Sequence, residues 1–142
     1  MVTRCFIDTN ILIYAEANDD LAKQQAALAL LKQLRISASG VLSTQVLQEY
    51  CNVCLKKLRL SPAHIRAQLA MYEQFEIVQV TPAIIRAGLD VEQTRSIGFY
   101  DAIVRASAQV AGCAVLYSED MNAGEVVDGV RIVNPFVEVL SV

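Results

Sequence analysis

Short apolar runs alternate with longer amphipathic segments along the chain. The runs are three or four residues long, most of them aliphatic on both faces, and they predict buried strands. Strands of this kind are typical of a parallel sheet that helices cover on both sides. The predicted strands lie at 5–7, 40–42, 77–80, 114–117 and 130–133.

The segments between the strands place apolar residues at helical spacing. Ser61-Pro62 and Thr81-Pro82 each put a capping hydroxyl before a proline at the first helical position. Asn18 or Asp19 is expected to cap another helix. The expected helices run from that cap to about 35, from about 45 to 58, and over 62–75, 82–94 and 99–112.

Three of these helices carry an apolar stripe that we expect to be buried. To within one short helix, the expected order is β-α-α-β-α-α-β-α-α-β-β. This order predicts a single α/β domain over residues 1–142, with a doubly wound central parallel sheet of about five strands flanked by helices. The stripes consist of Leu21, Leu28, Leu31 and Leu34; of Leu47, Tyr50, Cys51, Cys54, Leu55 and Leu58; and of Tyr100, Ile103, Val104, Ser107 and Ala111.

The composition fits one folded domain and indicates the cellular environment in which we expect it. The 142 residues are 54% apolar and 19% charged, which excludes a disordered chain. Mean hydropathy is +0.38, yet no run of about 18 apolar residues is present to span a membrane. Asp8 interrupts any leader-like start. We therefore expect a cytoplasmic protein with free thiols, no membrane association, and some apolar surface left for a subunit interface.

Four acidic residues fall where such a sheet gathers its ligands. Asp8 follows the first strand and Asp120 the fourth, so both lie at the carboxyl edge of the sheet. Asp101 is in the first turn of its helix, and Glu49 lies outside the apolar stripe of its own helix. Taken singly, each has an ordinary role as a cap, turn or surface residue, and Asp101 has Arg105 four residues on for an exposed ion pair. Their joint placement predicts that they converge.

Converging carboxylates raise one another's pKa values unless a cation neutralises them. Oxygen ligands without histidine or thiolate favour Mg²⁺ or Mn²⁺. Such a centre suits phosphodiester hydrolysis, in which an activated water attacks the phosphorus in line, the 3′ oxygen leaves and a 5′-phosphate results. Asn10 and Ser118 stand two residues from Asp8 and Asp120 and are expected to orient ligands or water around the centre.

Four blocks of the sequence together resemble a known family. FIDTNILIY at 6–14, Glu49 on the second long helix, FYDAIVRASA at 99–108 and VLYSEDMNAGEVVDGVRIVNPF at 115–136 are similar to PIN-domain ribonucleases, and more narrowly to the VapC-type toxins of toxin–antitoxin pairs. The resemblance implies a PIN-like fold, an endoribonuclease activity that depends on Mg²⁺ or Mn²⁺, a homodimer, and inhibition by a small antitoxin protein. The resemblance places the catalytic, metal-binding acids at Asp8, Glu49, Asp101 and Asp120, and it disfavours Glu119 as a ligand.

Two other functions share parts of this sequence pattern. A non-catalytic PIN-like module that binds RNA or protein is the main alternative, with the acids kept for structure. A phosphohydrolase of the haloacid-dehalogenase type is disfavoured, because Asn10 stands where that family needs a second aspartate as general acid. Cys51 and Cys54 form a C-x-x-C on an apolar stripe, which predicts core packing and not a zinc or redox site.

The formal net charge of −3 argues against a simple cationic nucleic-acid binder. When the four acids are set aside, the charge of the remainder becomes +1, so the acidity is concentrated at the predicted metal edge. Basic helix ends are usually solvated, but they also supply contacts to RNA phosphates. The candidates for RNA binding are Lys56, Lys57, Arg59 and Arg105.

Overall fold

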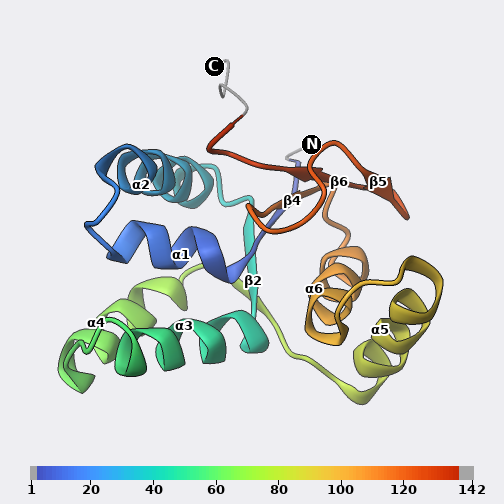
Figure 1. Ribbon diagram of the computed structural model, residues 1–142, viewed down its shortest axis with the longest axis horizontal. Coiled ribbons are helices and arrows are strands. Elements are labelled where there is room, and N and C mark those ends of the chain that lie inside the picture. The colour runs from blue at the N-terminus through green and yellow to red at the C-terminus, as the bar shows by residue number, and fades with distance from the viewer. Residues whose placement is uncertain (1–2, 138–142) are drawn as a thin grey trace.

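Parallel strands form the centre of the molecule in the computed structural model, which describes residues 3–137 (Figure 1). The sheet order is β3-β2-β1-β4-β6-β5, and every neighbouring pair is parallel except β5 with β6. This confirms the predicted central parallel sheet and adds one short antiparallel strand at its edge. The strands are β1 (Cys5–Ile7), β2 (Gly40–Ser43), β3 (Glu76–Val78), β4 (Val115–Tyr117), β5 (Val126–Val127) and β6 (Val130–Val133).

The central strands are short and are buried on both faces. All residues of β1 and β2 are buried, and apart from Ser43 none of them has a polar side chain, as the sequence predicts. β2 also shows close packing at Gly40, where a Cβ would come within 2.6 Å of the Phe75 ring. β5 was not predicted, although Asp128-Gly129 between valines is the sequence signal for a tight hairpin, and both of these residues have positive φ.

Six helices connect the strands within the described residues. In the view of Figure 1, α1 to α4 lie on one side of β2, and α5 and α6 lie on the other. Ser61 and Thr81 cap their helices as predicted, with prolines in the first turn. The cap of the second helix is Asp20 and not Asn18 or Asp19. The helices are α1 (Thr9–Glu16), α2 (Leu21–Ile36), α3 (Thr44–Lys56), α4 (Pro62–Tyr72), α5 (Pro82–Arg95) and α6 (Phe99–Val110).

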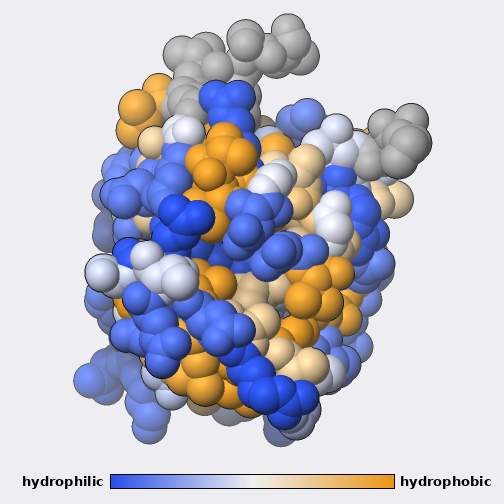
Figure 2. All heavy atoms as spheres, turned by 90° about the vertical axis from the view of Figure 1, so that its right-hand side faces the viewer, coloured by the Kyte–Doolittle hydropathy of each residue, from blue (hydrophilic) through white to orange (hydrophobic). Residues whose placement is uncertain are grey.

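The main core packs the sheet against helices α1 to α4 and against Val104 and Ala108 of α6, and a smaller apolar cluster joins α5 to α6. Four residues expected on buried stripes are instead exposed, because the stripes are wider than the surface that the neighbouring elements cover. In α5 and β5 too, apolar side chains stay at the surface, where Figure 2 shows them gathered among charged ones. The mispredicted residues are Leu21, Leu28, Leu55 and Tyr100.

Cys54 is buried, as the predicted core packing of the C-x-x-C requires, whereas Cys51 is only partly buried. Every cysteine in the described part of the chain is a free thiol. Between residues 3 and 137, no helix is both long enough and apolar enough to cross a membrane.

Candidate functional site

Asp8 occupies the position where β1 ends and α1 begins. It is the N-cap of α1, with Oδ1 accepting the Thr9 backbone N–H at 2.8 Å. Its Oδ2 accepts the Ser118 hydroxyl at 2.8 Å, and only 7% of the residue is exposed. Burial raises the pKa of Asp8 from 3.8 to about 6; the hydrogen bonds from Ser118 and Thr9 oppose this, and the charges of Asp101 and Glu49 add to it.

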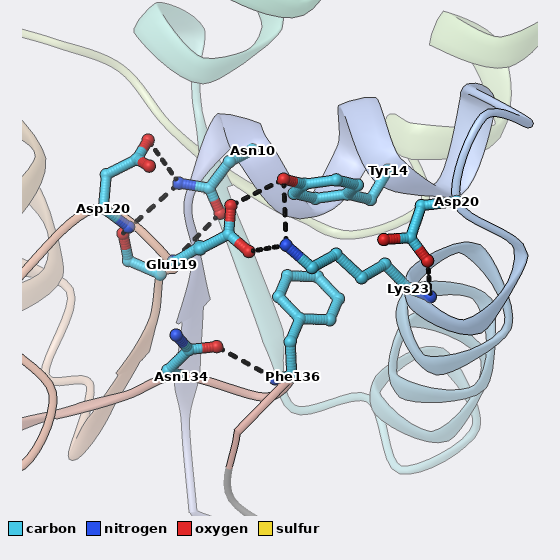
Figure 3. A network of polar contacts seen from close by, with 9 residues as sticks. Asn10, Tyr14, Asp20, Lys23, Glu119, Asp120, Asn134 and Phe136 are labelled. Carbon is cyan, nitrogen blue, oxygen red and sulfur yellow. Dashed lines mark hydrogen bonds and ion pairs between the residues drawn. The ribbon is translucent and has the colours of Figure 1, made fainter.

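Asn10 ties Asp8 to the turn that follows β4. Its Nδ2 donates to Asp120 Oδ2 at 3.1 Å and to Ser118 Oγ at 3.3 Å, and lies 3.4 Å from Asp8 Oδ2. Its Oδ1 accepts the Glu119 backbone N–H at 3.2 Å (Figure 3). Because the parallel strands β1 and β4 are neighbours, their carboxyl ends place these polar residues together. Asn10 and Ser118 are therefore hydrogen-bonded to the predicted acids Asp120 and Asp8, respectively.

The two other acids come from helices. Thr9 Oγ1 donates to Glu49 Oε1 at 2.8 Å, which joins the middle of α3 to the start of α1. Asp101 lies in the first turn of α6 and is exposed. Burial of its carboxyl group raises the pKa of Asp101, the charge of Asp120 raises it further, and that of Arg105 lowers it. The charges of Glu49 and Asp101 thus act on the pKa of Asp8, and the charge of Asp120 acts on the pKa of Asp101.

The donor set consists of carboxylate, amide and hydroxyl oxygens, which are the ligands that Mg²⁺ and Mn²⁺ prefer. Among residues 3–137, however, no three histidine, cysteine, aspartate or glutamate side chains are spaced to hold one ion together. Mg²⁺ usually binds through one or two carboxylates and keeps several waters. The chemistry of these side chains therefore fits such an ion, held through no more than two of the carboxylates.

Comparison with known families identifies the domain. The PIN domain family model matches residues 5–128, a stretch that contains all four acids. The chain belongs to the PIN domain family. No curated protein sequence matches it at a significant level.

Solved structures share the fold of this PIN domain. A toxin–antitoxin complex from Klebsiella pneumoniae has a TM-score of 0.69 and 20% identity, covering 92% of this chain and 97% of the other. VapC20 of Mycobacterium tuberculosis, described as a sarcin–ricin loop cleaving toxin, has 0.64 and 21%, covering 87% and 97%. DNA-bound VapBC of Salmonella typhimurium has 0.67 and 17%, covering 92% and 97%. The predicted PIN-like fold is confirmed, and the likeness to these VapC-type proteins is a likeness of fold.

Gln45 is a polar residue of the PIN domain that sequence reasoning missed. It is 8% exposed, and its Nε2 donates to the Tyr100 carbonyl oxygen at 3.1 Å, next to Asp101. Its Oε1 is buried and has no hydrogen-bond partner among the described residues. Gln45 precedes Glu49 by four residues, so both side chains lie on one face of α3. This four-residue spacing is the feature of the sequence that could have predicted Gln45 to lie beside Glu49.

The predicted RNA contacts fall in two different environments. Lys56 and Lys57 are exposed at the carboxyl end of α3, about 10 Å along the helix from Glu49. Arg105 is only 7% exposed, and its Nη1 donates to Glu125 Oε1 at 3.3 Å. The expected exposed ion pair of Arg105 with Asp101 is therefore wrong, because α6 turns this side chain toward the β4–β5 connection. Arg59, just beyond α3, is exposed as well.

Proposed function

We propose that this protein is a divalent-metal-dependent endoribonuclease and the toxin of a type II toxin–antitoxin pair. The observation that carries the proposal is Asp8, a buried carboxylate at the carboxyl edge of a PIN-domain sheet, with the charges of two further acids acting on it. A buried ionised carboxylate beside like charges is costly without a cation. Solved structures with this fold include a toxin described as cleaving the sarcin–ricin loop, which supports RNA as the substrate class.

The residues that would hold Mg²⁺ or Mn²⁺ are Asp8, Glu49, Asp101 and Asp120. When bound, such an ion neutralises charge that develops on the phosphate and lowers the pKa of water. The protein's own hydrogen-bonding groups orient the carboxylates. Ser118 and the Thr9 amide fix both oxygens of Asp8. Hydrolysis adds water across the bond from phosphorus to the 3′ oxygen, leaving a 5′-phosphate and a 3′-hydroxyl.

The two residues that follow Asp8 in the sequence orient the acids Glu49 and Asp120. The Thr9 hydroxyl directs Glu49, and the Asn10 amide directs Asp120. Polar groups that are already fixed before substrate binds need not reorganise during the reaction, which is a major source of rate enhancement. Exposed Lys56, Lys57 and Arg59 are proposed to contact RNA phosphates, while buried Arg105 is the weakest of the predicted contacts.

The decisive experiment measures cleavage of total cellular RNA by the purified protein with Mg²⁺, with Mn²⁺ and with EDTA. We expect cleavage with either ion and none in EDTA. The double variant Asp8→Asn/Asp101→Asn should be inactive while remaining folded by circular dichroism. Undiminished cleavage in EDTA, or by the folded double variant, would contradict the mechanism.

One observation favours the alternative of a non-catalytic RNA- or protein-binding module: the described residues contain no three side chains spaced to hold an ion together. A thermal unfolding titration with Mn²⁺ separates the two. A binding site raises the midpoint in a saturable manner by mass action. Acids that serve structure alone give no saturable change, and the catalytic proposal would then be abandoned.

The proposed partners are a cognate antitoxin and a second copy of the chain. Structures with this fold include toxin–antitoxin complexes, which supports an antitoxin encoded beside this gene. Apolar Ile85 and Leu89, exposed on α5, offer surface for a homodimer. Light scattering of the purified chain gives its oligomeric state, and co-purification with the product of the adjacent open reading frame tests the antitoxin. A monomer that retains no adjacent gene product would contradict both.

A further inference from the structure

The turn after β4 directs two adjacent carboxylates to different places. Asp120 accepts a hydrogen bond from Asn10 at the candidate site. Glu119 points to a separate group formed by Tyr14, Lys23 and Phe136, which we call the Glu119 clamp (Figure 3). The separation explains why Glu119, although it is adjacent to a proposed ligand, is not available to an ion.

Glu119 is held by two charge-assisted contacts. Tyr14 Oη donates to Glu119 Oε1 at 2.6 Å, and Lys23 Nζ donates to Glu119 Oε2 at 2.5 Å. Lys23 Nζ also donates to Tyr14 Oη at 3.3 Å. Burial on its own would raise the pKa of Glu119, but the hydrogen bonds from Lys23 and Tyr14 bring it below its ordinary value. Hydrogen bonds of this type are about twice as strong as neutral ones.

Two aromatic rings contact the ammonium group of the clamp. Lys23 Nζ lies 4.7 Å from the centroid of the Tyr14 ring and 5.6 Å from that of Phe136. The two rings meet edge to face with centroids 4.9 Å apart. These contacts are of the cation–π type and restrict where the Lys23 ammonium can lie. The clamp therefore joins α1, α2, the β4–β5 turn and the segment after β6.

Asn10 and Tyr14 lie four residues apart on α1, so one face of this helix holds the turn at two points. Asn10 binds the Glu119 backbone amide and the Asp120 carboxylate. Tyr14 binds the Glu119 carboxylate. With Glu119 fixed at both backbone and side chain, the rotation of the turn is fixed, and with it the direction of Asp120.

We propose that Glu119, Tyr14 and Lys23 are positioning residues that aim Asp120 at the candidate metal site and thereby set the affinity for the divalent ion. This inference rests on the proposed function, because Asp120 matters to the ion only if the site binds one. No member of the clamp needs to touch the ion or the RNA.

The test compares Lys23→Met with Lys23→Arg, and with Glu76→Gln as a matched control. Glu76 forms an exposed ion pair with Arg4 at the opposite, amino edge of the sheet, so Glu76→Gln also breaks an ion pair but leaves the turn intact. Binding of Mn²⁺ is followed by its electron paramagnetic resonance signal. We expect Lys23→Met to raise the half-saturating Mn²⁺ concentration about 5- to 10-fold. Lys23→Arg should recover most of this, and Glu76→Gln should match the wild type.

A second measurement needs no metal or RNA. Hydrogen exchange by nuclear magnetic resonance reports the Glu119 and Asp120 amides, which bond to Asn10 Oδ1 and to Ser118 Oγ. In Lys23→Met, both should exchange faster, while amides of β1 stay protected. Wild-type exchange together with a wild-type Mn²⁺ affinity in Lys23→Met would overturn the positioning role.

The two proposals fail in different ways. If the wild type neither binds Mn²⁺ nor cleaves RNA, the proposed function is wrong, and with it the link between the clamp and ion affinity. If the wild type does both and Lys23→Met lowers only the unfolding temperature, as much as Glu76→Gln does, the clamp serves stability alone and the positioning proposal is overturned.

Discussion

Replacing Asp8 with asparagine should stabilise the metal-free protein while abolishing the proposed ribonuclease activity. Asparagine has nearly the size of protonated aspartate and is an equally good N-cap, so α1 keeps its first hydrogen bond. What the substitution removes is a buried negative charge beside Glu49 and Asp101. Buried charged groups that serve function commonly lower the stability of the folded protein.

The size of the effect follows from the pKa of Asp8. A pKa raised from 3.8 to about 6 means that the folded state binds the proton more tightly than the unfolded state. The stabilisation that protonated Asp8 gives to the folded state is fully present below pH 3.8 and is lost as the pH rises through about 6. Above pH 7 the ionised group costs about 3 kcal/mol, and at pH 5 about half of that. Asp8→Asn has no charge at this position, so its free energy of unfolding does not carry this penalty.

The assay is urea unfolding in EDTA at pH 5.0, 6.0 and 7.5, with the wild type and Asp8→Asn compared at each pH. Asp128→Asn is the matched control, because Asp128 is an exposed aspartate at positive φ in the β5–β6 turn, where asparagine is well tolerated. We expect Asp8→Asn to gain stability that grows with pH and the control to show no such trend. A variant that is less stable than wild type at pH 7.5, or a difference that is constant with pH, would refute the reasoning.

Three further predictions concern the core, the ion pair of Arg105 with Glu125, and the basic end of α3. Gly40→Ala should lower the free energy of unfolding by about 1–3 kcal/mol in urea, because its methyl group would overlap the Phe75 ring; an unchanged midpoint would show that Phe75 moves freely. Glu125→Gln should destabilise the fold by about 1–3 kcal/mol, because it removes the charge partner of buried Arg105; a neutral result in thermal unfolding would show that water serves Arg105 instead. Lys56→Met should weaken RNA binding and reduce its salt dependence by about one ion in filter-binding assays, without changing the Mn²⁺ affinity; an unchanged salt slope would exclude a phosphate contact.

The sequence by itself determined most of the strands and helices and placed two of the candidate acids at one edge of the sheet. Apolar runs gave the parallel strands, and the Ser-Pro and Thr-Pro pairs gave two helix starts. Asp8 and Asp120 could be assigned to the carboxyl edge because each directly follows a strand. These are local properties, since capping, strand burial and helix periodicity depend on residues within about one turn of each other.

Only the tertiary structure decided which side chains meet. The Thr9–Glu49 hydrogen bond joins residues 40 apart, and Asn10 reaches Ser118 across 108 positions. No periodic pattern encodes such pairings, because they depend on strand order and on how helices pack across the sheet. The same reason explains the errors over Arg105 and Tyr100: hydropathy gives the face of a helix, but the neighbouring elements decide how much of that face is covered.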